Sequence, residues 1–328
     1  MRKSVYLFNS GELHKENDSL VLIDKSSNKT YIPIEQINLI VCFKEVTINS
    51  KTLFLLNKHK IAIHFLNFYG NLVARYIPKD YVDAKAIIEQ VNAYTNDERR
   101  TIIVRTIIVS SLKNCIALLK FYSKKGITLA DKIKDIKLII KQSNHKSINE
   151  LLLLEARAKK IYYSCFDLLL EEYGYSFIKR TTRPPKNEIN AMISFGYSIL
   201  YSKLLSIIDR SKLLSQISFI HSLSKRNESL QFDIADIVKP YIVDRLVIRL
   251  VRRKLIKSDY FDYGNNQCLL SDTGKKWFVK QFNETLNKTI KVNDKYYSYQ
   301  SLLIREVQLL TNYILDETFI YRPYIMKW

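Results

Sequence analysis

The sequence contains few of the residues that interrupt regular structure. Its 328 residues include only 7 glycines and 6 prolines, which is too few for a collagen-like, loop-rich or all-β repeat protein and favours long helices. The longest stretches without Asp, Glu, Lys or Arg are residues 61–74 and 189–202, whereas a membrane-spanning helix needs about 20 mostly apolar residues. The N-terminus also lacks the apolar region of a signal peptide. We therefore expect no membrane segment.

Cysteine pairs and common catalytic motifs are missing as well. Cys42, Cys115, Cys165 and Cys268 lie far apart and form no C-x-x-C pair, so the sequence predicts neither a zinc site nor a disulfide framework. We expect a reduced, cytoplasmic protein. The sequence has no G-x-x-x-x-G-K-S/T loop, no G-x-S-x-G and no H-E-x-x-H, which sets aside the mechanisms that depend on these motifs.

Positive charge, in contrast, is abundant. The chain has 52 Lys and Arg against 32 Asp and Glu, a net charge of +20. Because each basic side chain that neutralises a phosphate releases a counterion, this charge indicates a polyanionic partner. AT-rich codon usage is the competing explanation, but most of the excess lies in residues 91–328, as expected of a binding surface. Nucleic acid is favoured over a membrane, since no basic segment carries a lipid-facing apolar stripe.

The pattern of apolar residues predicts an α+β protein with a small β-rich N-terminal domain and a larger all-α domain. Short apolar runs predict strands at residues 4–8, 19–23, 37–43, 61–66 and 72–77, with a helix at 51–58 capped by Ser50. Helical spacing follows at residues 98–125, 148–173, 187–208 and 229–257. The expected domains are residues 1–80 and 91–328, joined by a linker at 81–90.

Two of these predicted helices have clear start signals. Ser147-Ile-Asn-Glu150 has the S-x-x-E form of a capping box. Asn187 follows a Pro-Pro pair and is placed to cap the next helix, which runs through Ile208.

Glu155 lies within an apolar helical face. The face is formed by Leu151, Ala158, Tyr162, Phe166 and Leu169. Burying a carboxylate there costs on the order of several kcal/mol unless it is paired, and a divalent cation is one such partner. The alternative is that Leu152–Leu154 widen the apolar face, so that Glu155 only borders it.

Asp233, Asp236 and His221 offer further ligands. The two aspartates are three residues apart and point to one side of a helix, so they could share a hard cation. A solvated helix start is the more common explanation for such a pair. A lone histidine is usually structural, but His221 near carboxylates would complete a site for Mn²⁺ or Mg²⁺.

Basic residues form two arrays that suit backbone phosphates. Arg245, Arg249, Arg252 and Arg253 follow at i, i+4, i+7 and i+8, and a solvated helix face is the alternative explanation. A second array surrounds Pro184-Pro185. The expected DNA-binding residues are Arg180, Arg183, Lys186, Lys225, Arg226, Arg245, Arg249, Arg252 and Arg253.

Four ordered segments resemble a known family, the CRISPR spacer-acquisition integrase, which is the first-numbered Cas protein. They are Leu153-Leu-Glu-Ala-Arg-Ala158 with Ile161-Tyr-Tyr163, then Arg180-Thr-Thr-Arg-Pro-Pro185 leading to Asn190–Tyr201, then Phe219-Ile-His221, and finally Ser229-Leu-Gln-Phe-Asp-Ile-Ala-Asp236 with Pro240 and Asp244-Arg245. The N-terminal Tyr6-Leu-Phe-Asn is similar to members of a type I branch. Ala156 stands where members often have glycine, and it keeps a small residue there.

The resemblance implies a site and an activity. Glu155, His221 and Asp236 match the family's metal-binding triad for Mg²⁺ or Mn²⁺, with Asp233, Asn190 and Tyr162 in support. The implied activity is that of a metal-dependent DNA endonuclease and integrase, which joins the 3′-hydroxyl ends of short DNA fragments to the CRISPR repeat. The implied partners are double-stranded DNA, a second copy of the chain bound through the N-terminal domain, and a small ferredoxin-like second Cas protein.

Two other functions remain open from the sequence. A tyrosine recombinase would use one of the 22 tyrosines, such as Tyr321 or Tyr324, as its nucleophile, although no cluster of basic residues and histidine surrounds either. A non-catalytic DNA-binding protein would keep the acidic residues for structure alone.

Overall fold

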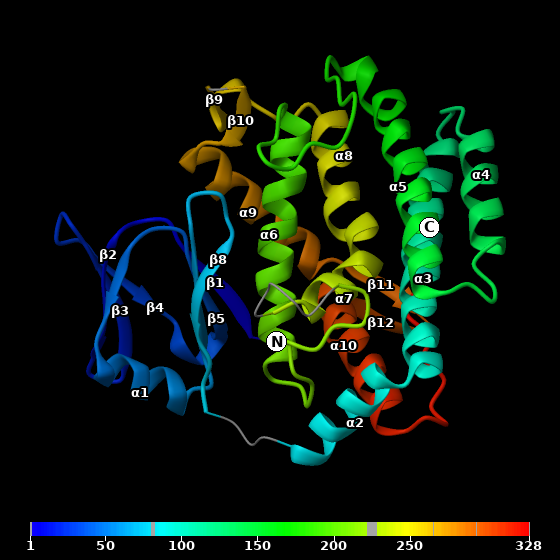
Figure 1. Cartoon of the computed structure of the whole chain (residues 1–328). Coiled ribbons are helices and arrows are strands. Elements are labelled where there is room, and N and C mark those ends of the chain that lie inside the picture. The colour runs from blue at the N-terminus through cyan, green and yellow to red at the C-terminus, as the bar shows by residue number, and fades with distance from the viewer. Residues whose placement is uncertain (1, 80–82, 222–227, 265, 293, 328) are drawn as a thin grey trace. The chain divides into compact units, whose positions relative to one another are not determined.

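The structure, a computed structural model, describes residues 2–79, 83–221, 228–264, 266–292 and 294–327. The chain separates into two compact units, Met1–Val82 and Asp83–Trp328. The first is rich in strands and the second is mainly helical (Figure 1), which confirms the predicted fold class.

The first unit is built from two four-stranded sheets. Its elements are β1 (Lys3–Leu7), β2 (Gly11–Glu16), β3 (Ser19–Asp24), β4 (Lys29–Ile32), η1 (Ile34–Gln36), β5 (Ile37–Cys42), β6 (Val46–Ile48), α1 (Ser50–Lys58), β7 (Ala62–Leu66) and β8 (Leu72–Tyr76). One sheet has the order β1-β5-β7-β8 and the other β4-β3-β2-β6. In the first sheet β5 pairs parallel to both β1 and β7, and β8 closes it antiparallel to β7.

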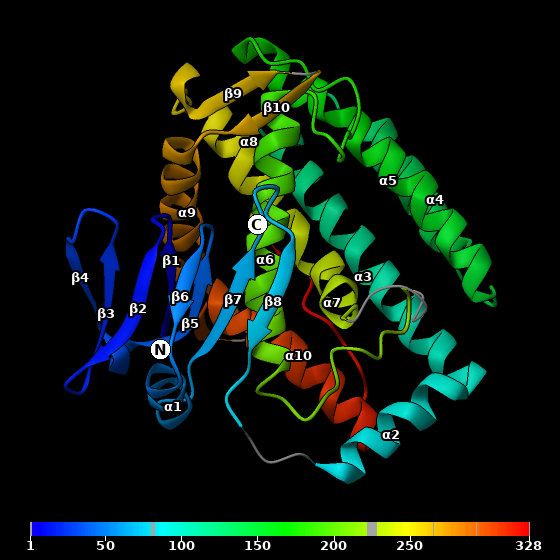
Figure 2. The same ribbon diagram turned by 60° about the vertical axis from the view of Figure 1, so that its left-hand side comes forward.

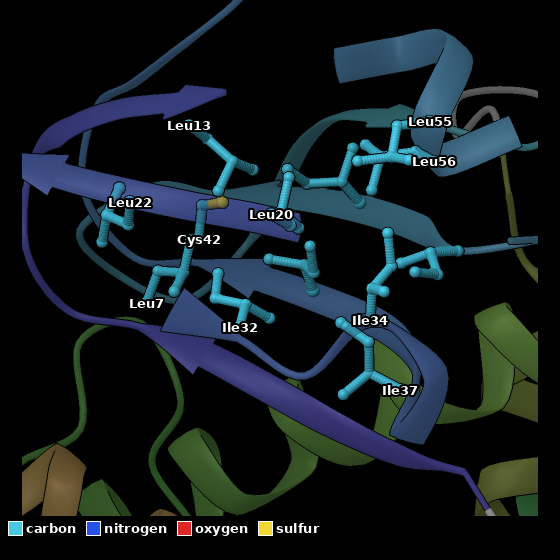
Figure 3. Close-up of a cluster of buried hydrophobic side chains, with 13 residues drawn as sticks. Leu7, Leu13, Leu20, Leu22, Ile32, Ile34, Ile37, Cys42, Leu55 and Leu56 are labelled. Atoms are coloured by element: carbon cyan, nitrogen blue, oxygen red, sulfur yellow. The ribbon is translucent and has the colours of Figure 1, made fainter. Parts of the chain in front are cut away.

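A single apolar cluster holds these sheets and α1 together. Side chains from both sheets meet in it, and Figure 3 shows Leu13 and Leu22 of one sheet near Cys42 of the other. Helix α1 adds Leu55 and Leu56, which are buried. Because every strand contributes an inward face, the small unit has a core of its own.

The strand predictions were partly right. The five predicted strands correspond to β1, β3, β5, β7 and β8, whereas β2, β4 and β6 were missed. Both β2 (GELHKE) and β4 (KTYI) have mostly polar sequences, so their pairing with β3, and not their own composition, makes them strands. The predicted cap of α1 was wrong, because the Asn49 side chain, and not Ser50, accepts the Thr52 amide.

The second unit is built around two central helices. Its elements are α2 (Ala84–Thr95), α3 (Asp97–Ser123), α4 (Ala130–Lys141), α5 (Ile148–Leu170), η2 (Glu171–Tyr173), α6 (Glu188–Ile208), α7 (Leu230–Lys239), η3 (Pro240–Asp244), α8 (Arg245–Arg252), η4 (Ser258–Tyr260), β9 (Phe261–Gly264), β10 (Gln267–Leu270), α9 (Asp272–Asn287), β11 (Thr289–Val292), β12 (Lys295–Ser298) and α10 (Tyr299–Leu315). Helix α3 packs against α4, α5 and α7, and α6 packs against α7, α9 and α10. Two hairpins, β9–β10 and β11–β12, are strands in the part expected to be all helical.

The helix boundaries follow the predicted signals closely in two places. Ser147 and Glu150 form the full capping box of α5, and Asn187 caps α6. Residues 84–90, expected in the linker, belong to α2, whose N-cap is Asp83. The predicted helix 229–257 is instead α7, the π-helical turn η3 and α8, because Pro240 supplies no amide hydrogen to continue the regular ladder.

Two helices, α3 and α6, are long and apolar enough to cross a membrane by length and composition alone. Of their most apolar windows, 67% and 83% respectively are buried inside the protein. The core helices of a folded unit pass this test as readily as membrane helices do. Here the apolar side chains of both helices pack inside the second unit.

Gly196 allows α6 to approach η3 and α9 closely. A Cβ atom at this position would lie 2.5 Å from Val243 Cγ1 and 3.1 Å from a ring carbon of Phe278. Both neighbours are fully buried, so neither side chain has free space to move into.

Gly196→Ala should therefore destabilise the second unit. Overpacking costs about 1–3 kcal/mol, and the better helix propensity of alanine recovers about 1 kcal/mol, which leaves a net loss of about 1 kcal/mol. A lower midpoint in thermal unfolding would show it. Gly264→Ala is the matched control, since nothing lies within 4 Å of its added Cβ, and equal midpoints for the two variants would contradict the close packing.

Two buried polar side chains fasten the C-terminal tail. Asn114 on α3 donates to the carbonyls of Ile237 (2.8 Å) and Tyr324 (3.0 Å) and accepts from the Met326 amide (2.8 Å). Glu306 on α10 accepts from the Tyr324 amide at 2.9 Å. Its second oxygen has no hydrogen-bond partner in the described structure, and burial raises the pKa of Glu306 to about 7.

Glu306→Gln should stabilise the protein in a pH-dependent way. An unfolded Glu titrates near 4.5 and the buried one near 7. As the pH rises through this interval the unfolded state loses its proton first, so the wild type loses up to about 3 kcal/mol of stability. Glutamine keeps the acceptor for Tyr324 and does not titrate.

The measurement is the difference in thermal midpoint between Glu306→Gln and wild type, which should widen in favour of the variant from about pH 5 to about pH 8. Glu172→Gln, at an exposed site, is the control. A difference that stays constant with pH would contradict the raised pKa of Glu306.

Candidate functional site

The carboxylate of Asp233 on α7 organises the segment that carries His221. Its Oδ2 accepts the amides of Phe219 (2.7 Å) and Ile220 (3.1 Å), and its Oδ1 lies 2.6 Å from His221 Nδ1. Asp233 is fully buried. With Nδ1 held by a carboxylate, Nε2 is the ring nitrogen of His221 that could act as a ligand, the arrangement that orients metal-binding histidines.

Two hydroxyl groups add hydrogen bonds to the turn formed by residues 218–221, which carries His221. Ser218 Oγ donates to the His221 carbonyl at 2.7 Å, and Ser229 Oγ donates to Ser218 Oγ at 2.8 Å. Ser229 directly precedes α7, so the histidine turn and the helix that carries both aspartates are joined by hydrogen bonds at each end.

Glu155 on α5 and Asp236 on α7 influence each other's ionisation. Burial raises the pKa of Glu155, and the charge of Asp236 raises it further. The pKa of Asp236 is raised by burial, but Lys239, Lys159 and His221 outweigh this and hold it below its usual range. Electrostatic coupling of this kind requires proximity, so an acid from α5, an acid from α7 and His221 share one region.

Two lysines balance these acids. Lys239 Nζ lies 2.6 Å from Asp236 Oδ1, and its ammonium also lies 4.9 Å and 5.1 Å from the ring centroids of Tyr197 and Tyr201. Lys159 donates to Ser111 Oγ at 2.9 Å. Burial lowers the pKa of each lysine, but nearby acidic groups raise it more, so both carry positive charge beside the carboxylates.

Tyr162, expected to support the site, belongs to a buried network behind it. Its hydroxyl donates to Asp244 Oδ2 at 2.7 Å, and the Tyr197 hydroxyl donates to Asp244 Oδ1 at 2.6 Å. Tyr163 and Tyr197 share a hydrogen bond of 2.8 Å. This network connects α5, α6 and the end of η3, and thereby fixes the helices on which the acids lie.

The residues present suit a divalent cation. Two carboxylates and one imidazole nitrogen are the mixed oxygen and nitrogen set that Mn²⁺ and Mg²⁺ accept. Burial and then the charge of Asp236 raise the pKa of Glu155, and a cation would oppose both effects. Among the described residues, no three His, Cys, Asp or Glu side chains are already arranged as metal ligands. Asp236 is engaged by Lys239, so metal binding and this ion pair compete for the same carboxylate.

Asn190 and Arg180 hold a neighbouring segment to α6. Asn190 Oδ1 accepts from Arg180 Nη1 (3.0 Å) and from the Thr181 amide (3.0 Å). Arg180 also donates to Ser194 Oγ at 2.9 Å. The Arg180 guanidinium is therefore occupied inside the protein, whereas Arg183 and Lys186 on the same segment are exposed.

The predicted basic array lies on α8, with Arg253 directly after its last residue. Arg245, Arg249 and Arg252 are half-buried and Arg253 is exposed. The first three are held in place by hydrogen bonds from Arg245 to the Tyr299 hydroxyl (3.0 Å), Arg249 to Thr285 Oγ1 (3.1 Å) and Arg252 to the Leu169 carbonyl (3.2 Å).

Like charges accumulate on this face of α8. The pKa of Arg249 is lowered by burial and then by Arg253 and Arg245. The pKa of Lys288 is likewise lowered by burial and then by Arg249, Arg253 and Arg245. An anion would reduce this repulsion, as expected of a phosphate contact. Lys225 and Arg226, also expected to bind DNA, lie outside the described residues.

The structure does not favour a tyrosine nucleophile. Tyr321 is buried, and burial raises its pKa well above the usual value. Burial also raises the pKa of Tyr324. Neither side chain is therefore readily ionised.

Several residues of this region were missed in the sequence. Lys159 lies four residues after Glu155 and Lys239 three after Asp236, so helical spacing could have indicated both. Asp244 and Tyr197 were seen only as parts of motifs, because their contacts join distant segments.

Asp233→Asn should lower the pKa of His221. Burial lowers this pKa, but the hydrogen bond and charge of Asp233, together with Asp236, raise it above 6.5. The resulting stabilisation is present at low pH and is lost as the pH rises through the folded pKa. The variant's stability deficit should therefore shrink as the pH rises above 6.5.

Titration of the His221 ring by NMR in the metal-free protein measures this directly. Asp262→Asn, at an exposed position on β9, is the control and should leave the titration unchanged. A His221 pKa that is the same in Asp233→Asn and wild type would show that the Asp233 contact does not raise the pKa of the ring.

Comparison with known proteins identifies the family. Residues 5–284 match the family described as CRISPR associated protein Cas1. The CRISPR-associated endonuclease Cas1 of Thermotoga maritima is 36% identical over 318 residues, which cover 96% of this chain and 98% of that protein. One from Thermodesulfovibrio yellowstonii is 30% identical over the full length of both chains.

Solved structures agree with this match. A Cas1 protein from Thermotoga maritima superposes with a TM-score of 0.85 at 34% identity, covering 96% of this chain and 97% of that one. A casposase bound to integration product shares the fold, with a TM-score of 0.84 at 22% identity over 100% of this chain and 96% of that chain. The chain therefore belongs to the Cas1 family, as its motifs indicated, and the named relatives above are CRISPR-associated endonucleases.

Proposed function

We propose that this protein is a divalent-metal-dependent DNA endonuclease and integrase of CRISPR adaptation. Its reaction would be a transesterification in which the 3′-hydroxyl of a short DNA fragment attacks a phosphodiester at the boundary of the CRISPR repeat. One phosphorus–oxygen bond forms to the incoming oxygen as another breaks to the repeat strand. With water in place of the hydroxyl, the same site would cleave DNA.

The main support is the shared region of Glu155, Asp236 and His221. Three segments far apart in sequence bring two interacting acids and one oriented imidazole together. These residues would hold Mg²⁺ or Mn²⁺, and such an ion when bound activates an attacking oxygen and stabilises charge on phosphate oxygens.

The chain's own residues would prepare this site. Asp233 fixes the ring of His221 and leaves Nε2 available. Lys159 and Lys239 reduce the repulsion between the two acids, of which Asp236 is buried and Glu155 is half-buried. The Asp244 network keeps α5, α6 and η3 in place.

The basic residues would hold the DNA backbone. The α8 arginines offer guanidinium groups that are already oriented by Tyr299, Thr285 and Leu169, so little conformational entropy is lost when they bind phosphate. Arg183, Lys186, Lys225 and Arg226 would extend this contact. The structure favours a positioning role for Arg180 over direct phosphate binding, because α6 already engages it.

We also propose the assembly and location that the family implies. A solved complex that shares this fold is described as Cas6-RT-Cas1–Cas2, which supports a second Cas protein as a partner. The N-terminal unit would mediate a homodimer. All four cysteines are free and buried, which suits the reducing cytoplasm.

Alanine substitutions at the three proposed ligands test this function. Glu155→Ala, His221→Ala and Asp236→Ala should each reduce Mn²⁺-dependent strand joining by more than about 100-fold. Removing a residue that only supports a metal ligand typically costs about 10–100-fold, and removing the ligand itself should cost more. Joining is measured on short duplexes with a repeat-containing target, with EDTA as the metal-free condition.

DNA binding separates the alternatives. The variants should bind DNA nearly as tightly as wild type in EDTA, because binding depends mainly on the basic residues. Glu172→Ala, an exposed acid just after α5, serves as the matched control. Wild-type joining in all three variants would remove the proposed site, and a wild type that binds DNA without joining or cleaving it would indicate a binding protein.

A further inference from the structure

The segment that precedes His221 is supported along its length by α2 and the start of α3. After α6 this segment runs toward α2, as both views show (Figures 1 and 2). Three contacts follow in order. Asp83 pairs with Lys212 (2.9 Å), Gln90 bonds residues 214 and 217, and Arg100 bonds residue 219.

Gln90 makes the central contact of this series. Its Nε2 donates to the carbonyls of Leu214 (3.0 Å) and Ile217 (2.9 Å), and its Oε1 accepts the Leu214 amide (2.8 Å). The side chain is fully buried. Since residues 214 and 217 lie outside any helix or strand, Gln90 replaces the hydrogen bonds that regular structure would supply.

Arg100 supports the next part of the segment from the same side. Its Nε donates to the Phe219 carbonyl at 3.0 Å, and its guanidinium stacks 4.2 Å from the ring centroid of Tyr94. The amide of Phe219 is bound by Asp233. The backbone two residues before His221 is thus held by α3 at its carbonyl and by α7 at its amide.

We propose that Gln90 is a positioning residue for His221, with Arg100 as its second support. The proposal rests on the proposed function, since positioning matters only if His221 binds the metal. Asp233 contacts each of the last three residues of the segment, whereas Gln90 holds the part that precedes them. Without Gln90, the half-buried backbone of Leu214 and Ile217 would lose three hydrogen bonds to α2. The Ser215 carbonyl, which accepts the amides of Ser229 and Leu230, would then be the main backbone attachment in this part of the segment. A displacement of about 1 Å at a catalytic group is enough to impair a site.

Gln90→Met tests this proposal, because methionine has a similar length but neither donates nor accepts these hydrogen bonds. Gln90→Glu is the second variant, since a carboxylate still accepts the Leu214 amide but cannot donate to the two carbonyls. Gln308→Met is the matched control on an exposed face of α10. Thermal unfolding first establishes that each variant is folded.

Two measurements then decide the outcome. Amide hydrogen exchange at Phe219 and Ile220, in full-length protein without metal or DNA, should be about tenfold faster in the Gln90 variants. Mn²⁺ binding, followed by the EPR signal of the free ion, should weaken by about tenfold, within the range seen when residues that orient metal ligands are removed. Gln308→Met should match wild type in both, and Arg100→Lys should show a smaller change in the same direction.

Wild-type exchange rates in both Gln90 variants would overturn the proposal, as would faster exchange with unchanged Mn²⁺ affinity. If neither Gln90 variant folds, Arg100→Lys decides the matter by the same two measurements. A failure of the proposed function appears separately. In that case wild-type protein would bind Mn²⁺ through an oriented His221 yet show no strand joining.

Discussion

The candidate site depends on one buried carboxylate with three donors. Asp233 accepts two backbone amides and faces the imidazole nitrogen of His221, which compensates for burying its charge. Because Phe219 and Ile220 lie outside any helix or strand, this carboxylate supplies the partners for both of their amides. The imidazole then has one tautomer and one direction. Asp233 is therefore the residue through which α7 determines where the histidine lies, although it is not itself one of the three expected ligands.

Charge balance is the second constraint. The two other acids, Glu155 and Asp236, are close enough to oppose each other's ionisation, and Lys159 and Lys239 offset this from the same two helices. Each lysine follows its acid by about one helical turn, so each helix brings a matched pair of charges into the site. The positive charge of the two lysines offsets the repulsion between the acids, which is the role that a cation would take in the proposed function.

The sequence predicted the features that are local. The capping box of α5 and the Asn187 cap each depend on residues only three positions apart. The two-part fold follows from the change between short strand-like segments and long helical ones along the chain. Glu155 and Asp236 were recognised from helical spacing and motif order, and their role as ligands stays a prediction. The contacts of Gln90 and Asn114 could not be predicted from the sequence, because each side chain forms hydrogen bonds with backbone groups more than a hundred residues away. The polar strands β2 and β4 were missed for a related reason, since their partners define them.

The π-helical turn η3 affects how the acids of α7 and the arginines of α8 are oriented relative to each other. It adds a residue to the winding between the acids of α7 and the arginines of α8. One residue corresponds to about 100° of rotation around a helix axis. A deletion within Pro240–Asp244 that restored ordinary winding would therefore turn the arginines to a different side of the helix, while leaving every charged residue in the chain. In this region the winding of the helix, as much as the identity of its side chains, determines how the arginines are oriented relative to the acids.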